Sequence, residues 1–231
     1  MIEKPTRILF DWGGTLCKDS LLFEYYLKNS SGFNFKGNQY SFRPDFWEII
    51  KDENEGKFFF ENQEKVFDIS ELYCDSINTV NKFNGTVGMS SEYENYIVFD
   101  YKPELKLPQE KIQLLFAKTL QERGIKANGI YVNADKVSLA KTIGVDFIVD
   151  DDPRIIIALA AANIKSILVS RLWNRSFCYN DLFHYVSMKK REIVANNIFI
   201  AEDFNDIERI VRNQKTQGDI NNVKRNHETS S

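Results

Sequence analysis

One short stretch near the start of this chain limits the possible folds more than any other. Residues 7–16 read RILFDWGGTL, so an apolar run with strand propensity ends abruptly in Asp11 and is followed by two glycines and Thr15. A carboxylate at such a junction is expected where a strand gives way to a loop. Glycine lets a ligand approach the main chain, and Thr15 offers a hydroxyl and an amide. Two interpretations remain open from these residues alone: a chemical site, or a buried strand followed by a glycine turn.

The chain from residue 95 onward alternates short apolar runs with helical patterns. Strands are predicted over residues 96–99, 129–133, 146–149, 166–169 and 197–200. Helices are predicted over residues 108–123, 136–143, 153–162 and 203–211. Short buried strands that alternate with helices indicate a parallel sheet covered on both faces. The predicted fold is therefore α/β, with a doubly wound, mostly parallel Rossmann-like sheet that binds ligands at the carboxyl ends of its strands.

The segment after the first strand has a different composition, rich in aromatic residues and asparagine. It contains three amphipathic patterns, over residues 21–27, 44–50 and 69–83. We interpret it as a small helical cap, of the kind that closes over a site and excludes water. The polar end of the chain is expected to be disordered. The predicted units are a core of residues 1–16 and 95–212, a cap of residues 17–94, and a tail of residues 213–231.

Composition narrows the possible partners. The chain has 231 residues and a net charge of -3, without the basic face that nucleic-acid binding needs. Its three cysteines have no Cys-x-x-Cys spacing, which suits a reducing cytoplasm. Neither an apolar leader nor an apolar stretch of membrane-spanning length is present. We therefore expect a cytoplasmic protein that binds neither nucleic acid nor membrane, and its oligomeric state stays open.

A second group of acids ends another predicted strand. Residues 147–153 read FIVDDDP, and a doubly wound sheet places this strand end beside Asp11. Carboxylates so close together repel one another unless a cation joins them or one is protonated. Mg²⁺ is the natural candidate, because it takes carboxylate oxygens, a carbonyl and a substrate phosphate. Asp152 precedes Pro153 and is predicted to cap a helix, which leaves Asp150 and Asp151 for the site.

The run FDWGGTL at residues 10–16 resembles the nucleophile motif of the haloacid dehalogenase-like hydrolases, which are mostly phosphatases that form a phosphoaspartyl intermediate. The resemblance implies that Asp11 is the nucleophile. It also implies a metal site made by Asp11, the carbonyl of Gly13 and Asp151, with Asp150 in support. Gly14 and Thr15 are the expected substrate-binding residues of the same motif.

The superfamily also places a lysine before the second acidic strand. Lys136 matches that lysine, and Lys141 is the weaker alternative. The pattern over residues 7–175 is most similar to the 5'(3')-deoxyribonucleotidase-like branch. That similarity lies in the helical insertion and in two runs, GVDFIVDD at residues 144–151 and SRLWNR at residues 170–175.

Two positions depart from the superfamily pattern. The second aspartate, the usual general acid and base, is replaced by Gly13. The second strand ends in DYKP at residues 100–103, where the similar branch has Thr-Ala-Arg-Pro and its threonine binds phosphate. Lys102 is expected to neutralise part of the phosphate charge. Asp100 is a candidate for the missing proton donor, and the alternative is that it only caps a loop.

These features predict a magnesium-dependent phosphohydrolase that acts through an aspartyl-phosphate on a small phosphorylated molecule, with a nucleotide-like substrate as one option. Without the second aspartate, aryl and acyl phosphates should be preferred, because their leaving groups need no proton. One alternative is a catalytically impaired binding or regulatory protein of the same fold. Another is the phosphonoacetaldehyde hydrolase branch, which has a small residue at the position of Gly13. That chemistry needs a cap lysine, for which the candidates are Lys18, Lys28 and Lys36.

Overall fold

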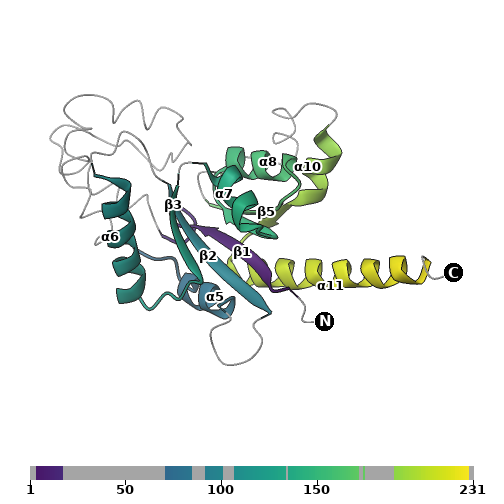
Figure 1. The fold of residues 1–231 in the computed structure, drawn as a ribbon, viewed down its shortest axis with the longest axis horizontal. Coiled ribbons are helices and arrows are strands. Elements are labelled where there is room, and N and C mark those ends of the chain that lie inside the picture. The colour runs from purple at the N-terminus through teal and green to yellow at the C-terminus, as the bar shows by residue number, and fades with distance from the viewer. Residues whose placement is uncertain are drawn as a thin grey trace.

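The computed structural model describes residues 4–17, 71–84, 92–100, 107–133, 135–171, 174 and 190–228. Its strands form one parallel sheet in the order β3-β2-β1-β4-β5-β6 (Figure 1). The strands are β1 (Thr6–Asp11), β2 (Tyr93–Asp100), β3 (Gly129–Asn133), β4 (Phe147–Asp150), β5 (Lys165–Val169) and β6 (Ile198–Ala201). The predicted α/β fold with a doubly wound parallel sheet is therefore confirmed.

The strand order creates a switch point between β1 and β4. From β1 the chain adds β2 and β3 on one side, and it then returns to the other side of β1 to add β4, β5 and β6. Phe10 pairs with Val149, and Asp11 pairs with Val98, so the carboxyl ends of the three central strands lie next to one another. Open α/β sheets bind their ligands at such a point.

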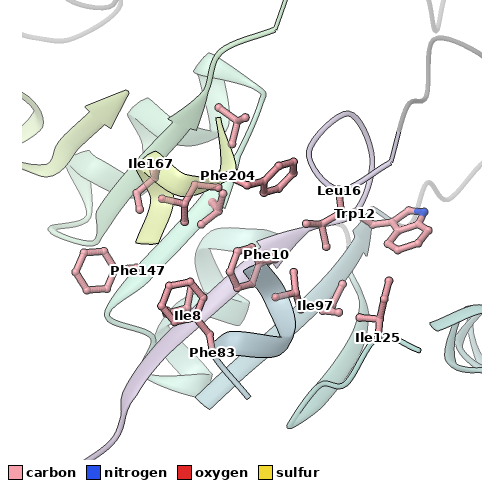
Figure 2. Close-up of a cluster of buried hydrophobic side chains, with 14 of the residues drawn as sticks. Ile8, Phe10, Trp12, Leu16, Phe83, Ile97, Ile125, Phe147, Ile167 and Phe204 are labelled. Carbon is pink, nitrogen blue, oxygen red and sulfur yellow. The ribbon is translucent and has the colours of Figure 1, made fainter. Parts of the chain in front are cut away.

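Helices cover both faces of the sheet (Figure 1). Ile8 and Phe10 of β1 pack into one buried cluster, and Leu9 packs into another. The first cluster, shown in part in Figure 2, also contains residues of α5 (Ser76–Lys82), α6 (Gln109–Glu122) and α11 (Phe204–Glu228). The second contains residues of α7 (Lys136–Ile143), α8 (Pro153–Ala161) and α10 (Arg191–Asn197). Alternate side chains of the central strand thus supply the two cores.

The helix ends follow the local signals in the sequence. Asp152 caps α8 and accepts a hydrogen bond from the backbone N–H of Arg154, with Pro153 in the first turn, as predicted. Gly144 ends α7 with a φ of 69°, a conformation that favours glycine. Within the described ranges, no helix is both long enough and apolar enough to cross a membrane.

Three segments differ from the sequence expectation, and one of them, α10, was not predicted. The third predicted cap helix, over residues 69–83, is the shorter α5, and its Val80 packs with Phe83 and Phe10 in the core. The first two predicted cap helices lie outside the described residues, so the extent of a cap stays a prediction. The chain after Arg212, expected to be disordered, continues α11 to Glu228. A helix that is already nucleated and packed extends at low cost, which a composition argument does not include.

Candidate active site

Lys136 lies at the centre of a group of acids at the carboxyl edge of the sheet. Its Nζ atom donates hydrogen bonds to Asp11 Oδ1 at 2.8 Å and to Asp150 Oδ2 at 2.7 Å. Asp100 Oδ1 lies 3.2 Å from the same nitrogen. The structure therefore brings together three of the predicted acids and the predicted lysine. Lys141, the alternative, is exposed in the last turn of α7.

Lys136 is the first residue of α7, and a capping aspartate before it fixes where this helix begins. Asp135 accepts a hydrogen bond from the backbone N–H of Ser138, which starts α7 at Lys136. Only 3% of the Lys136 side chain is exposed. Burial alone would lower the pKa of Lys136, but the nearby carboxylates, Asp11 first, outweigh burial and raise this pKa well above its ordinary value. Lys136 is thus a permanent positive charge within the site.

The acids outnumber the buried ammonium. One carboxylate oxygen from each of Asp11, Asp150 and Asp151 lies within 4.8 Å of the others, and all three residues are buried. Burial raises the pKa of Asp11 well above its usual range, Lys136 opposes this rise, and the neighbouring acids add to it. Such a group of hard oxygen donors, with more negative than positive charge, could hold a divalent cation.

The acids of β4 and its following turn have different hydrogen bonds. Asp150 accepts from Lys136 on Oδ2 and from the backbone N–H of Asp152 on Oδ1 at 2.8 Å. Asp151 accepts a 3.0 Å hydrogen bond from Thr15 Oγ1, and Thr15 is fully buried. Asp150 therefore orients Lys136, and Thr15 orients Asp151.

The loop after β1 fits closely against Asp151. Gly14 has a φ of 69°, and a Cβ atom at this position would lie 2.1 Å from Asp151 Oδ2. A larger residue would therefore displace the carboxylate. Gly13 belongs to the same loop, and its backbone forms an isolated β-bridge with that of Cys17. Lys102, the last predicted substrate-binding residue, lies outside the described residues.

Two further residues hold the loops around the acids. Arg171 donates from Nε to Gly14 O at 2.9 Å and from Nη2 to Thr15 O at 2.6 Å. Asn174 donates from Nδ2 to Asp151 O at 2.9 Å and accepts on Oδ1 from the backbone N–H of Arg171. Arg171 also lies 3.8 Å from the centre of the Tyr73 ring. One guanidinium thus joins the β1 loop to the segment after β5.

Sequence reasoning assigned no role to Arg171 or Asn174. Both lie in the run SRLWNR directly after β5, a strand that ends at the same sheet edge as β1 and β4. Their position after that strand is the signal that marks them as residues of the site.

Comparison with known proteins gives a likeness of fold. No family model and no curated protein matches the sequence. A haloacid dehalogenase-like family hydrolase from Streptococcus pneumoniae is similar in structure, with a TM-score of 0.57 at 13% identity over 90% of this chain and 98% of that chain. A hydrolase of the same family from Xanthomonas campestris has a TM-score of 0.52 at 10% identity over 92% of this chain and 97% of that chain. This chain therefore has the fold of the haloacid dehalogenase-like hydrolases.

Proposed function

We propose that this protein is a magnesium-dependent phosphohydrolase that transfers a phosphoryl group from a small phosphorylated molecule to Asp11 and then to water. The observation that carries the proposal is the ammonium of Lys136, hydrogen-bonded to Asp11 Oδ1 and Asp150 Oδ2 at the switch point of the sheet. A buried lysine that holds a carboxylate at a ligand-binding edge is what a nucleophilic aspartate needs, because it fixes the orientation of the attacking group.

The proposed reaction has two steps. In the first, a carboxylate oxygen of Asp11 attacks phosphorus, and the bond from phosphorus to the leaving oxygen breaks with its electron pair on that oxygen. In the second, water attacks the phosphorus of the aspartyl-phosphate. The bond to Asp11 then breaks, the carboxylate is restored, and inorganic phosphate leaves with a proton released to solvent.

The residues that would hold Mg²⁺ are Asp11, Asp151 and the carbonyl of Gly13, with Asp150 in support. When bound, the ion supplies the positive charge that lets an anionic phosphate approach several carboxylates. Lys136 supplies a further positive charge from the protein, and Thr15 keeps Asp151 oriented through its hydroxyl. A metal here also favours the ionised form of Asp11, which burial disfavours.

The substrate preference follows from Gly13. This position has no side chain to donate a proton to the leaving group or to take one from water. Aryl and acyl phosphates should therefore react faster than alkyl phosphates, because their leaving groups depart without a proton. Equal rates on aryl and alkyl phosphates of the same size would contradict this part of the proposal.

The first experiment measures hydrolysis of an aryl phosphate with and without Mg²⁺ in the wild type and in Asp11→Asn. The expected result is turnover that depends on magnesium and is lost in the variant. Glu122→Gln is the matched control, because it makes the same change at an exposed site on α6 and should keep the wild-type rate. Turnover that survives in Asp11→Asn would exclude Asp11 as the nucleophile.

A second candidate function is a binding or regulatory protein with an impaired site. The observation that favours it is the absence of a carboxylate at Gly13, combined with an ammonium that already faces three carboxylates. The same assay separates the candidates. A wild type that releases no more phosphate than Asp11→Asn, while it still binds Mg²⁺, would favour the binding protein.

A further inference from the structure

Asp100 differs from the other acids around Lys136 in its exposure. Its side chain is 37% exposed, whereas those of Asp11 and Asp150 are 5% and 1% exposed. It is the last residue of β2, where the strand pairs with β3 through Asn133. Among the described partners of Lys136, Asp100 is therefore the most exposed to solvent.

The number of hydrogen bonds that Lys136 can donate explains why the exposure of Asp100 matters. An ammonium has three N–H groups and no acceptor. Two of them donate to Asp11 and Asp150, and Asp100 Oδ1 lies 3.2 Å from the same nitrogen. A phosphate oxygen that contacts this ammonium therefore competes with three carboxylates, of which Asp100 is the most exposed. Two anions held against one ammonium repel each other in a partly buried site.

We propose that Asp100 is a displaceable counter-ion that competes with the phosphate of a ligand for Lys136 and so sets how tightly the site binds phosphate. This inference rests on the proposed function, because it takes Lys136 to contact the substrate phosphate. Asp100 is easier to displace than the two buried carboxylates, since a side chain that is already 37% exposed regains water more fully when it rotates away. Asp11 and Asp150 are buried, and either one would lose its paired ammonium without gaining solvent.

The test measures the binding of inorganic phosphate by titration calorimetry in saturating Mg²⁺, at fixed pH and ionic strength. The proteins are the wild type, Asp100→Asn, Asp100→Ser and Glu122→Gln. Glu122 is exposed near the C-terminal end of α6, so its variant removes one negative charge away from the cluster. We expect both Asp100 variants to bind phosphate about tenfold more tightly, as a like charge is removed from the contact. Glu122→Gln should bind as the wild type does.

Two results would overturn the inference. Phosphate binding of equal or lower affinity in both Asp100 variants would show that Asp100 does not compete for Lys136. A fall in kcat on alkyl phosphates in Asp100→Asn, with unchanged phosphate affinity, would assign Asp100 the role of proton donor instead. Thermal melts of each variant exclude misfolding, and Asp100→Ser repeats the test with a smaller neutral side chain.

The outcome also separates this inference from the proposed function. Measurable phosphate binding that is the same in wild type and Asp100 variants rejects the counter-ion role and leaves the phosphohydrolase proposal standing. If no protein binds phosphate, and the aryl phosphate is not hydrolysed either, the proposed function fails and the inference fails with it. A lower KM for the aryl phosphate in Asp100→Asn, at similar kcat, would support both.

Discussion

Gly13 stands where the resembled hydrolases have a second aspartate, so the proposed reaction lacks a general acid and base. Adding that carboxyl group by mutation tests its role. The backbone of Gly13 does not have the positive φ of Gly14, so a side chain at this position meets no left-handed backbone strain. Gly13→Asp should raise kcat on alkyl phosphates by about 10²-fold, the lower range for general acid-base catalysis, and should raise it less on aryl phosphates. Gly13→Asn is the control of equal size, because its amide is not a general acid or base. An equal gain in both variants would contradict proton transfer as the cause.

Gly14 tests the close contact with Asp151. Gly14→Ala should weaken Mg²⁺ binding and reduce turnover. The new Cβ atom would lie 2.1 Å from Asp151 Oδ2, which is too close for two non-bonded atoms, so the carboxylate would have to move. Gly124→Ala is a matched control, since Gly124 has the same φ of 69° and a Cβ atom added there would meet no heavy atom within 4 Å. The backbone strain common to both variants should cost about 1–2 kcal/mol in urea unfolding. A loss of Mg²⁺ affinity in both variants would assign the effect to strain.

Residues differ in how far the sequence can predict them. Asp11 is predictable because the strand pattern fixes where it falls, and Lys136 because the resembled superfamily places a lysine before the second acidic strand. The sheet topology then brings the two residues together. The hydrogen bond from Thr15 to Asp151 could not be predicted, because the two residues are 136 positions apart and it depends on how their loops pack together. Arg171 is missed for the same reason, because its partners are backbone carbonyls that carry no sequence signal.

The central strands carry a second network, away from the site. Arg7 of β1 pairs with Glu94 of β2 at 2.8 Å, and Tyr96 Oη donates to Glu94 Oε2 at 2.7 Å. Burial, followed by the hydrogen bond to Glu94, raises the pKa of Tyr96 to about 12. The folded state therefore favours the neutral phenol more than the unfolded state does. The stabilisation is complete below about pH 10, the pKa of an unperturbed tyrosine, and is lost as the pH rises toward 12.

Tyr96→Phe measures this contribution at the level of the β1–β2 pair. At neutral pH the variant should be less stable by about 1 kcal/mol, because it lacks the hydrogen bond to Glu94. The gap between the two proteins should narrow as the pH rises above about 10, since only the wild type has the phenol to ionise there. Urea unfolding at a series of pH values checks this. A gap that stays constant into the alkaline range would mean that Tyr96 titrates alike in both states.

At the level of elements, periodicity and caps predicted the strands after β1 and the helices α6, α7 and α8 to within a few residues. They did not predict α10, and they ended α11 at residue 211, well before Glu228. The sequence signals of the predicted helices are local: Pro153 after a capping aspartate, and Gly144 after α7. The packing of α5 against the sheet was not predictable, because Val80 and Phe83 lie about 70 positions after Phe10 in the sequence. A periodic pattern predicts that a helix such as α5 buries one face, but it does not say which strand that face meets.

Across the whole molecule, the acid cluster should reduce stability when no cation is bound. Three buried carboxylates lie close together beside one ammonium, and burial of uncompensated charge opposes folding. The acid cluster lies at the carboxyl ends of β1 and β4, where doubly wound sheets bind their ligands. Stability and metal binding are therefore expected to be linked in this protein.

The linkage predicts that Mg²⁺ raises the melting temperature of the wild type and that a chelator lowers it again. A ligand at about a hundred times its Kd stabilises the folded state by about 2.7 kcal/mol. Asp151→Asn should remove most of this shift and melt higher than the wild type in the chelator, because it relieves repulsion while its amide oxygen still accepts from Thr15. Glu122→Gln should keep the full shift, and KCl at equal ionic strength controls for screening. An equal Mg²⁺ shift in wild type and Asp151→Asn would place the ion elsewhere on the molecule.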